Sequence, residues 1–317
     1  MVLHLTESEV QHLLDMPTAI AAVEQSFREL AAGRAHNVPR QRAQGKGIVL
    51  HTMSAAADYL GLVGYKAYTT TRSAAQFHVG LLDQTTGRLV ALIEADQLGR
   101  LRTGATTGVA VKHLAPPDLS ELGLFGVGRQ ARTQLVAVCA VRPIQRAFVY
   151  SRKPAERQTF CDELSHELNI DVRPVDLPEQ AVRNVPLIIT ATSSGTPVFA
   201  GNNASDGALI CAVGSNWLNR AEIDETVVRR STRIVCDSIA ACQHEAGDFT
   251  AALASGAFDW SRAVELADVV TGKFAGQPNT SGLTLFKSVG MATEDLALGA
   301  ILLDLARQQG VGTQLPI

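Results

Sequence analysis

Three short segments of the chain carry side chains that could bind an anion or transfer a proton. Lys66 follows a short apolar segment, Arg100 and Arg102 open an Ala- and Gly-rich segment, and Asp237 ends another apolar segment. Lysine and arginine donate charge-assisted hydrogen bonds to a carboxylate, whereas an aspartate can give a proton to a substrate atom or take one from it. Each residue taken singly also fits a simpler role, as a solvated lysine, an ion pair or a helix cap.

A glycine-rich motif predicts that the chain binds a dinucleotide. The apolar segment 122–125 is followed by Gly126-x-Gly128-x-x-Ala131 and then by an apolar helical pattern. Gly126 permits a tight turn after the strand, Gly128 lets the backbone approach a pyrophosphate, and Ala131 allows close packing of helix on strand. The helix would direct its first N–H groups at the anion. The motif also fits a glycine-rich loop in other α/β proteins, but its position between strand and helix favours a dinucleotide.

The residues after the next expected strand indicate which dinucleotide is bound. That strand ends at Tyr150 and is followed by Ser151-Arg152-Lys153, where NAD sites usually carry an Asp or Glu for the ribose hydroxyls. No carboxylate is present here to repel a 2′-phosphate, Arg152 offers a planar fork of donors, and Ser151 offers a hydroxyl. We therefore expect NADP(H) to be favoured, with NAD(H) possible. The alternative is a solvated loop that binds nothing.

The composition is that of a globular protein with two domains. The chain has 317 residues, of which 46% are hydrophobic and 19% charged, and this length exceeds one ordinary core. The formal net charge of −3 and the lack of a Lys/Arg tract argue against a nucleic-acid or membrane-surface partner. The sequence contains neither an apolar run long enough to span a membrane nor a basic-then-apolar leader, so we expect a cytoplasmic protein.

Cysteine and histidine spacing gives no indication of a metal site. The cysteines lack C-x-x-C spacing, and we expect reduced, mostly buried thiols at Cys139, Cys161, Cys211, Cys236 and Cys242. No two histidines have the H-x-x-x-H or H-E-x-x-H spacing of metal ligands. We therefore expect no metal ion.

The first third of the chain predicts a mixture of helices and strands. A capping-box pattern opens a first helix, and a second helix begins after Asp15 and ends at Gly33. Strands and turns are expected over 38–95 and a helix over 103–114. Pro116-Pro117 is the best linker signal.

Beyond this linker, strands alternate with helices. Such alternation predicts a Rossmann-type, doubly wound parallel sheet, with strands at 122–125, 146–150, 187–191, 208–213 and 233–236. A last helix over 292–309 is expected to return to the N-terminal part. The predicted α/β protein therefore divides into a second, α+β domain, residues 1–115 with 291–317, and a dinucleotide-binding domain, residues 116–290. We expect the reactive cleft between them, at the carboxyl ends of the parallel strands.

Short motifs along the whole chain resemble those of the ornithine cyclodeaminase/mu-crystallin family. The resemblance rests on the number, order and spacing of these motifs rather than on any one of them. The matching segments are Pro39-Arg40, Gly64-x-Lys66, Asp83-x-x-Thr86-Gly87, Arg102-Thr103-x-Ala105, Gly126-x-Gly128-x-Gln130-Ala131, Gly214-Ser215-Asn216, Asp237, Gln243 with Glu245-Ala246-Gly247-Asp248, and Thr284-Leu285-Phe286-Lys287-Ser288-x-Gly290 with Glu294-Asp295.

The resemblance implies an organisation and a range of activities. Members are usually homodimers in which a Rossmann domain holds NAD(P) and a second domain binds substrate and dimerises. They reduce cyclic imines, oxidise or reductively aminate amino acids, or convert ornithine to proline with loss of ammonia. We therefore expect a small amino-acid or cyclic-imine substrate.

The resemblance also implies roles for individual residues. Arg40, Lys66 and Arg102 would hold the substrate carboxylate, and Lys66 would also take part in catalysis. Asp237 would act as acid and base at the substrate nitrogen. The dinucleotide would contact the glycine motif and its surroundings, namely Gly126, Gly128, Arg129, Gln130, Ala131, Ser151, Arg152, Thr192 and Ser288.

One position departs from the pattern of the family's cyclodeaminases. They commonly carry a Glu two residues before the Met of a Met-Pro-Ala-like turn, where it can meet the distal amino group of ornithine. Here the turn is Met53-Ser54-Ala55, and His51 takes the place of that Glu. An imidazole is a poor partner for an ammonium group, so we expect His51 to contact a different substrate, although it also fits an ordinary strand histidine.

Both departures, at His51 and at Arg152, favour a reductase. Our leading hypothesis is an NADPH-dependent reductase of Δ1-pyrroline-2-carboxylate or Δ1-piperideine-2-carboxylate, which would form proline or pipecolate. The alternatives are an ornithine cyclodeaminase with bound NAD, an amino acid dehydrogenase such as alanine dehydrogenase, and a non-catalytic, crystallin-like NADP-binding protein.

Overall fold

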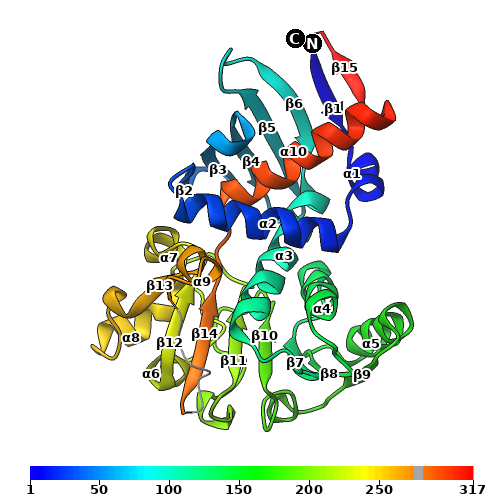
Figure 1. Cartoon of the computed structure of the whole chain (residues 1–317). Coiled ribbons are helices and arrows are strands. Elements are labelled where there is room, and N and C mark those ends of the chain that lie inside the picture. Colours follow the sequence, from blue (N-terminus) through cyan, green and yellow to red (C-terminus); the bar gives the residue numbers. More distant parts are fainter. Residues whose placement is uncertain (275–280, 317) are drawn as a thin grey trace. The chain divides into compact units, whose positions relative to one another are not determined.

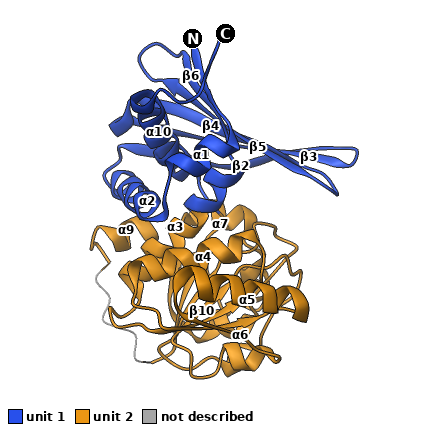
Figure 2. Ribbon diagram, turned by 90° about the vertical axis from the view of Figure 1, so that its right-hand side faces the viewer, with its two compact units in different colours: residues 1–102, 290–317 blue, residues 103–289 orange. Residues whose placement is uncertain are grey.

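The computed structural model describes residues 1–274 and 281–316, and it divides into two compact units (Figure 2). Unit 1 comprises residues 1–102 and 290–317, and unit 2 comprises residues 103–289. The first division lies inside a long helix, α3 (Asp96–Leu114), rather than at Pro116-Pro117. The first turns of α3 therefore belong to unit 1 and the remaining turns to unit 2.

Unit 1 is built on a mixed seven-stranded sheet in the order β15-β1-β6-β5-β4-β3-β2. β1 pairs in parallel with β6, and the other neighbours are antiparallel. The strands are β1 (Val2–Leu5), β2 (Ala35–Gly45), β3 (Ile48–Ala57), β4 (Leu62–Thr70), β5 (Ala75–Asp83), β6 (Leu89–Glu94) and β15 (Thr313–Leu315). The sequence pattern missed β1 and β15, which join the two ends of the chain.

The helices of unit 1 begin where the sequence signals predict. The carboxylate of Glu9 accepts hydrogen bonds from the backbone N and the hydroxyl of Thr6, both at 2.8 Å, before α1 (Glu7–Leu13). Asp15 Oδ1 accepts from the backbone N of Thr18 at 2.9 Å and caps α2 (Met16–Ala31). Charged and polar side chains thus fix both helix starts, as the capping pattern implies.

The last helix, α10 (Ala292–Gln309), packs against α2 and lies across β3, β4 and β5 (Figure 1). Its bounds agree with the predicted range. Gly64 on β4 permits this close approach, because a Cβ atom there would lie 3.2 Å from Leu296 of α10 and would overlap the carbonyl oxygen of Gly80. The start of α10 is therefore brought beside the residues of β4.

Unit 2 is built on an all-parallel eight-stranded sheet in the order β13-β12-β14-β11-β10-β7-β8-β9. This confirms the predicted doubly wound class. The strands are β7 (Glu121–Phe125), β8 (Arg146–Tyr150), β9 (Asp171–Pro174), β10 (Leu187–Thr190), β11 (Leu209–Ala212), β12 (Ser231–Cys236), β13 (Ala263–Glu265) and β14 (Leu283–Lys287). The sequence pattern missed β9, β13 and β14.

The helices of unit 2 connect these strands (Figure 1). They are α4 (Arg129–Val141), α5 (Pro154–Leu168), α6 (Glu225–Arg230), α7 (Ile239–Glu245), α8 (Thr250–Ala254) and α9 (Leu266–Val270), besides the end of α3. The strand order reverses between β7 and β10, and doubly wound sheets bind ligands outside the carboxyl ends of the strands at such a point. Across residues 1–274 and 281–316, each helix is too short or too polar to cross a membrane.

Candidate active site

In unit 1, two of the predicted substrate-binding cations pair with adjacent carboxylates at the start of α10. Lys66 Nζ lies 2.7 Å from Asp295 Oδ1. Arg102 Nη1 lies 3.0 Å from Glu294 Oε2, and Arg102 Nε lies 3.5 Å from Asp295 Oδ1. All four side chains are buried. Asp295 therefore joins the lysine of β4 to the arginine of α3.

Burial and the neighbouring charges change the pKa of Lys66. Burial lowers the pKa of Lys66 to about 8; Asp295 opposes this shift, whereas the positive charges of Arg102 and Arg40 add to it. These interactions place Arg40, Lys66 and Arg102 close enough to act on one another. The three cations expected to hold a carboxylate therefore form one cluster in unit 1.

Arg40 and His51 both lie near the ring of Tyr68. The pairing of β2 with β3 is irregular between Val38 and Gln41, which is where Arg40 stands, with its guanidinium carbon 5.9 Å from the ring centre of Tyr68. The imidazole of His51 stacks on the same tyrosine, with ring centres 4.2 Å apart and planes 4° apart. An irregular strand pairing often re-aims a side chain toward a site.

His51 is an electrically neutral member of the cluster at neutral pH. Its Nε2 lies 3.1 Å from the hydroxyl of Thr70. Burial, followed by the charges of Arg42 and Arg40, lowers the pKa of His51 to about 4. The position that carries a Glu in the cyclodeaminases thus supplies no negative charge here.

Two glycines leave room for the cations. A Cβ atom at Gly99 of α3 would lie 2.8 Å from Lys66 Nζ. Gly290, just before α10, has a φ of +84°, and a Cβ atom there would overlap the guanidinium of Arg102. The left-handed conformation of Gly290 and the space beside it both exclude a larger residue.

In unit 2, Asp237 lies at the carboxyl end of β12, as predicted, and is held by donors that follow β14 and by donors at and within α7. Asp237 Oδ2 accepts from the hydroxyl of Ser288 at 2.7 Å and from the backbone N of Val289 at 2.8 Å. Asp237 Oδ1 accepts from the backbone N of Ser238 at 2.8 Å and from the thiol of Cys242 at 3.7 Å. These bonds fix the orientation of a buried carboxylate and show that Ser288 contacts Asp237.

A second carboxyl group lies near Asp237 on the neighbouring strand. Glu265 ends β13, and its Oε1 accepts from the backbone N of Ile239 at 3.0 Å. Burial raises the pKa of Glu265 to about 7; the N–H of Ile239 opposes this shift, and the charges of Asp237 and Asp268 add to it. Glu265 therefore titrates near neutral pH.

The glycine motif has the backbone shape that a dinucleotide needs. Gly126 has a φ of +110°, and a Cβ atom there would lie 2.5 Å from the carbonyl oxygen of Ala191. A Cβ atom at Gly128 would meet nothing within 4 Å, so the space above the turn is open. Gly128 is the N-cap of α4 and has no side chain of its own to cap the first N–H groups of this helix. Such N–H groups bind phosphate oxygens, so these residues fit the pyrophosphate.

The other predicted cofactor residues surround this turn in part. Ala131 is fully buried, whereas Arg129 is exposed and Gln130 half-buried on the first turn of α4. Ser151 and Arg152 directly follow β8, which pairs with β7 through Tyr150 and Phe125. The Arg152 side chain is exposed. Arg152 is therefore accessible to a ligand that lies over the glycine turn between β7 and α4.

Thr192 is held in place by a buried carboxylate. Its backbone N and its hydroxyl both donate to Glu222 Oε1, each at 2.7 Å. Thr192 stands two residues beyond β10, at the edge where a dinucleotide would lie. It is held by a carboxylate that the sequence analysis did not select.

Sequence reasoning also missed the acidic partners of the cations. Glu294 and Asp295 belong to a motif that matched the family, yet no role was assigned to them. Their signal is local, because two adjacent carboxylates open a helix whose residues are otherwise largely apolar. Buried carboxylates need a partner, and the pairing with Lys66 and Arg102 supplies it.

The cysteines and possible metal ligands give a simpler result. All five cysteines are free thiols, of which Cys139 is half-buried and the others are buried. Within the described ranges, no three His, Cys, Asp or Glu side chains come together in a way that could hold a metal ion.

Comparison with known proteins identifies relatives over the whole chain. The sequence profile of the ornithine cyclodeaminase/mu-crystallin family matches residues 2–310. Δ1-Pyrroline-2-carboxylate reductase 2 of Burkholderia ambifaria is 32% identical over 300 residues, which covers 92% of this chain and 91% of that protein.

Two solved structures show the same fold. Δ1-Pyrroline-2-carboxylate reductase of Thermococcus litoralis, in complex with NADH and L-proline, has a TM-score of 0.93 at 32% identity and covers 99% of this chain and 100% of its own. An archaeal alanine dehydrogenase dimer with bound NAD has a TM-score of 0.93 at 27% identity and covers 100% of this chain and 99% of its own. Both of these relatives bind NAD(H).

Proposed function

Because the chain belongs to the ornithine cyclodeaminase/mu-crystallin family, we propose that it is an NAD(P)H-dependent reductase of a cyclic ketimine acid. The substrate would be Δ1-pyrroline-2-carboxylate or its six-membered homologue, and the product proline or pipecolate. Unit 1 would bind the substrate, and unit 2 would bind the dinucleotide.

The observation that carries this proposal is the buried cluster of Lys66, Arg102 and Asp295. A lysine has three N–H donors and an arginine five, and Asp295 holds both cations in a fixed arrangement. Such an arrangement suits the single carboxylate of an imino acid, because charge-assisted bonds from two directions fix its orientation. The relative from Thermococcus litoralis, which binds L-proline, supports this substrate class.

Asp237 would transfer the proton in this reaction. Reduction of a cyclic imine adds a hydride to carbon and a proton to nitrogen, and the bound nicotinamide would supply the hydride. A carboxylate beside the nitrogen stabilises the cationic iminium, which accepts a hydride more readily than the neutral imine. The four donors around Asp237 would hold its carboxylate in the orientation that this role requires.

The surroundings of His51 disfavour ornithine as the substrate. The distal ammonium of ornithine would need an acceptor or a negative charge. With its pKa lowered to about 4, His51 is neutral at pH 7, and the charges that act on it are those of Arg42 and Arg40. Positive charges repel an ammonium group, whereas the uncharged ring of a cyclic imine meets no such cost.

Arg152 supports a preference for NADPH over NADH. Its exposed side chain directly follows β8, where it can donate to a 2′-phosphate. Ser151 stands beside it, and its carbonyl oxygen is held by Arg157 at 2.9 Å. The loop therefore has a fixed backbone and a cation at the position that distinguishes the two dinucleotides.

The protein would act as a homodimer. The β2–β3 hairpin extends from unit 1 (Figure 2) and exposes three large apolar side chains, Val38, Ile48 and Leu50. The related alanine dehydrogenase is a dimer. Light scattering should show a dimer for the wild type and a more weakly associated dimer for Ile48→Glu. A monomeric wild type would contradict the proposal.

The experiment that tests the activity is a paired assay on the purified protein. One arm follows NADPH or NADH oxidation with the five- and six-membered ketimine acids, and the other follows ammonia release from L-ornithine with a trace of NAD. We expect rapid NADPH oxidation and no ammonia. Ammonia release without net change in the dinucleotide would identify a cyclodeaminase, and binding of NADPH without turnover of any substrate would favour a non-catalytic role.

A further inference from the structure

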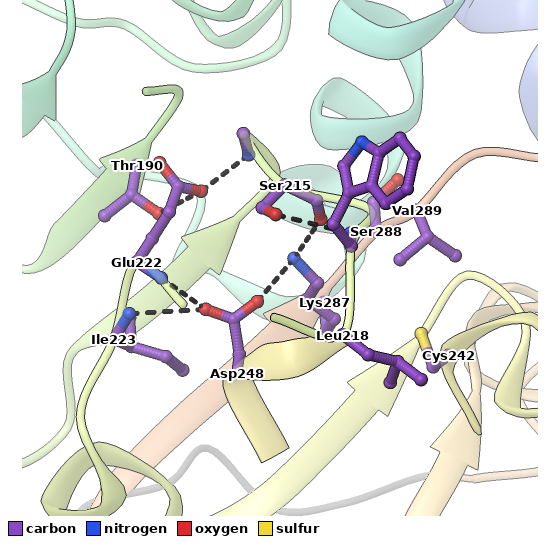
Figure 3. A network of polar contacts seen from close by, with 12 residues as sticks. Thr190, Ser215, Leu218, Glu222, Ile223, Cys242, Asp248, Lys287, Ser288 and Val289 are labelled. Carbon is purple, nitrogen blue, oxygen red and sulfur yellow. Dashed lines mark hydrogen bonds and ion pairs between the residues drawn. The ribbon is translucent and has the colours of Figure 1, made fainter. Parts of the chain in front are cut away.

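Three buried ionisable side chains form a network at the carboxyl edge of the unit 2 sheet (Figure 3). Glu222, Asp248 and Lys287 are each at most 2% exposed. Asp248 Oδ2 lies 2.8 Å from Lys287 Nζ, and Asp248 Oδ1 accepts from the backbone N of Glu222 at 2.7 Å. The proposed proton transfer and carboxylate binding use none of these side chains.

The carboxylate of Glu222 accepts hydrogen bonds from the segments that follow two neighbouring strands, β10 and β11. Its Oε1 accepts from the N–H and the hydroxyl of Thr192, beyond β10. Its Oε2 accepts from the hydroxyl of Thr190 at 3.0 Å and from the backbone N of Gly214, beyond β11, at 2.6 Å. A Cβ atom at Gly214 would overlap the backbone of Thr192, so the two segments are packed directly against each other.

Lys287 holds the same region from the neighbouring strand β14. Its ammonium donates to the carbonyl oxygen of Ser215 at 2.8 Å, as Figure 3 shows. A Cβ atom at Gly247, beside Asp248, would overlap the carbonyl oxygen of Arg220. The segment from Gly214 to Glu222 is therefore fixed by β14 and by the turn that carries Asp248.

A network of buried charges stabilises a fold poorly, because each charged side chain loses its contacts with water. Burial lowers the pKa of Lys287, but the charges of Asp248 and Glu222 outweigh burial and raise it, so the side chain stays charged. Two buried carboxylates then share one buried cation. Buried ion pairs can often be replaced by apolar residues without loss of stability, so a role beyond stability is the better explanation.

The fixed segments lie on the side of the sheet expected for the nicotinamide. A doubly wound sheet has two mononucleotide-binding halves that meet where the strand order reverses. The glycine motif follows β7, and β8 and β9 form the half that carries the candidate 2′-phosphate residues. The segments after β10 and β11 belong to the other half.

We propose that Glu222, Asp248 and Lys287 are positioning residues, which hold Thr192 and the segment from Gly214 to Ser215 in the shape that binds the nicotinamide half of the dinucleotide. The inference rests on the proposed use of NAD(P)H but not on the identity of the substrate. It predicts that damage to the network weakens binding of the nicotinamide half and spares the adenosine half.

The test compares a whole dinucleotide with a truncated one, without substrate. Calorimetry would measure the dissociation constants of NADPH and of 2′-phospho-ADP-ribose, which lacks the nicotinamide ring, and the pair NADH and ADP-ribose would be measured alongside. The variants are Lys287→Met and Thr190→Val. Thr190→Val keeps all three ionisable side chains and removes only one donor to Glu222, so it remains informative if Lys287→Met does not fold.

A matched control separates positioning from general stability. Arg230 is a cation of unit 2 that also holds backbone carbonyls, those of Gly201 at 2.6 Å and Ala204 at 2.8 Å, but it lies just before β12, at the opposite end of the strands from Asp237. Arg230→Met should lower the melting temperature and leave both dissociation constants unchanged.

The expected result is selective. Lys287→Met should weaken NADPH binding about tenfold and Thr190→Val about threefold, whereas the truncated ligand should bind within about twofold of the wild-type value, because small displacements of positioning groups cost binding only where contact is made. Equal losses for both ligands, or no loss for either, would overturn the inference. Failure of the wild type to bind any nicotinamide dinucleotide would instead refute the proposed function.

Discussion

The ammonium nitrogen of Lys66 lies 2.7 Å from the Oδ1 atom of Asp295, although 229 positions separate the two residues in the chain. The contact joins an inner strand of the sheet, β4, to the start of the last helix, α10. It supplies a negative charge to a buried lysine, and it connects that lysine to Arg102 through the same oxygen. The return of the C-terminal helix therefore completes the candidate carboxylate site.

Lys66 should make carboxylate binding sensitive to alkaline pH. Its pKa is lowered to about 8, so the unliganded protein loses this charge as the pH rises through 8. Pyrrole-2-carboxylate, a carboxylate whose ring nitrogen does not take a proton in this range, should bind about tenfold more weakly at pH 9.5 than at pH 7. Titration calorimetry with the dinucleotide present would measure the change.

Lys66→Arg is the control for this prediction, because an arginine keeps its charge throughout the range. The variant should show a flat affinity between pH 7 and pH 9.5, whatever its absolute value. Parallel curves for the variant and the wild type would show that another group causes the pH dependence.

Gly290 should be intolerant of even a methyl group. Gly290→Ala would place a side chain on a backbone with a φ of +84° and would push the guanidinium of Arg102 from its position. We expect a lower melting temperature and a loss of about tenfold or more in carboxylate affinity, since Arg102 can no longer pair with Glu294 as it does now. Thermal unfolding and carboxylate titration would measure the two effects.

Gly256→Ala separates the effect of backbone strain from the effect of displacing a neighbouring side chain. Gly256 has a φ of +74°, but a Cβ atom there would meet nothing within 4 Å. This variant should lose about 1 kcal/mol from backbone strain alone and bind a carboxylate as the wild type does. If Gly290→Ala also retained full affinity, the proposed role of Arg102 would be excluded.

The sequence could reveal cations and glycines but not their partners. Lys66 and Asp237 could be selected because each follows a short apolar segment, and Arg102 because it opens an Ala- and Gly-rich segment. Asp295 could not be paired with Lys66 from sequence, because the contact depends on α10 crossing the sheet of unit 1. Local patterns predict helices and strands, whereas such pairings depend on the tertiary fold.

The strands that the sequence pattern missed are explained by their place in the sheet or by their short length without an apolar run. β14 lies between β11 and β12 although it follows both in the chain, and β9 and β13 have only four and three residues. Neither β9 nor β13 carries the apolar run that made the similarly short β10 and β11 recognisable. The insertion of β14 matters to the site, because it brings Lys287 and Ser288 beside Asp237.

Glu265 should make the stability of the protein depend on pH near neutrality. Its pKa is raised to about 7, so the folded protein keeps a proton that the unfolded chain releases above pH 4.5. This contribution is complete below the unfolded pKa and is lost as the pH rises through 7. Glu265→Gln removes the ionisation, so the variant should gain stability over the wild type between pH 5 and pH 8, by on the order of 1–2 kcal/mol after allowance for solvent screening.

Chemical denaturation at pH 5 and pH 8 would measure this difference. Glu163→Gln provides a comparison, because Glu163 is an exposed carboxyl group of the same unit and its replacement should have the same effect at both pH values. A constant difference between Glu265→Gln and the wild type would mean that Glu265 ionises normally.

Arg152 should distinguish the two dinucleotides. Arg152→Ala should raise the KM for NADPH about tenfold and change that for NADH less than twofold, because only NADPH carries the 2′-phosphate. Lys153→Ala is the matched control, since Lys153 is an adjacent, exposed cation that pairs with Glu156 at 2.7 Å. Equal effects of Arg152→Ala on both dinucleotides would reject the proposed preference.

Asp237 should be required for turnover but not for folding. Asp237→Asn keeps the size of the side chain and removes its capacity to exchange a proton, so kcat should fall at least about a hundredfold. Ser288→Ala removes one donor to Asp237 and leaves its charge, and the expected loss is about tenfold, because the carboxylate is then held by fewer donors. Melting temperatures of both variants would show whether unit 2 is folded. A folded Asp237→Asn variant with an unchanged kcat would exclude Asp237 from the mechanism. Another group would then have to transfer the proton.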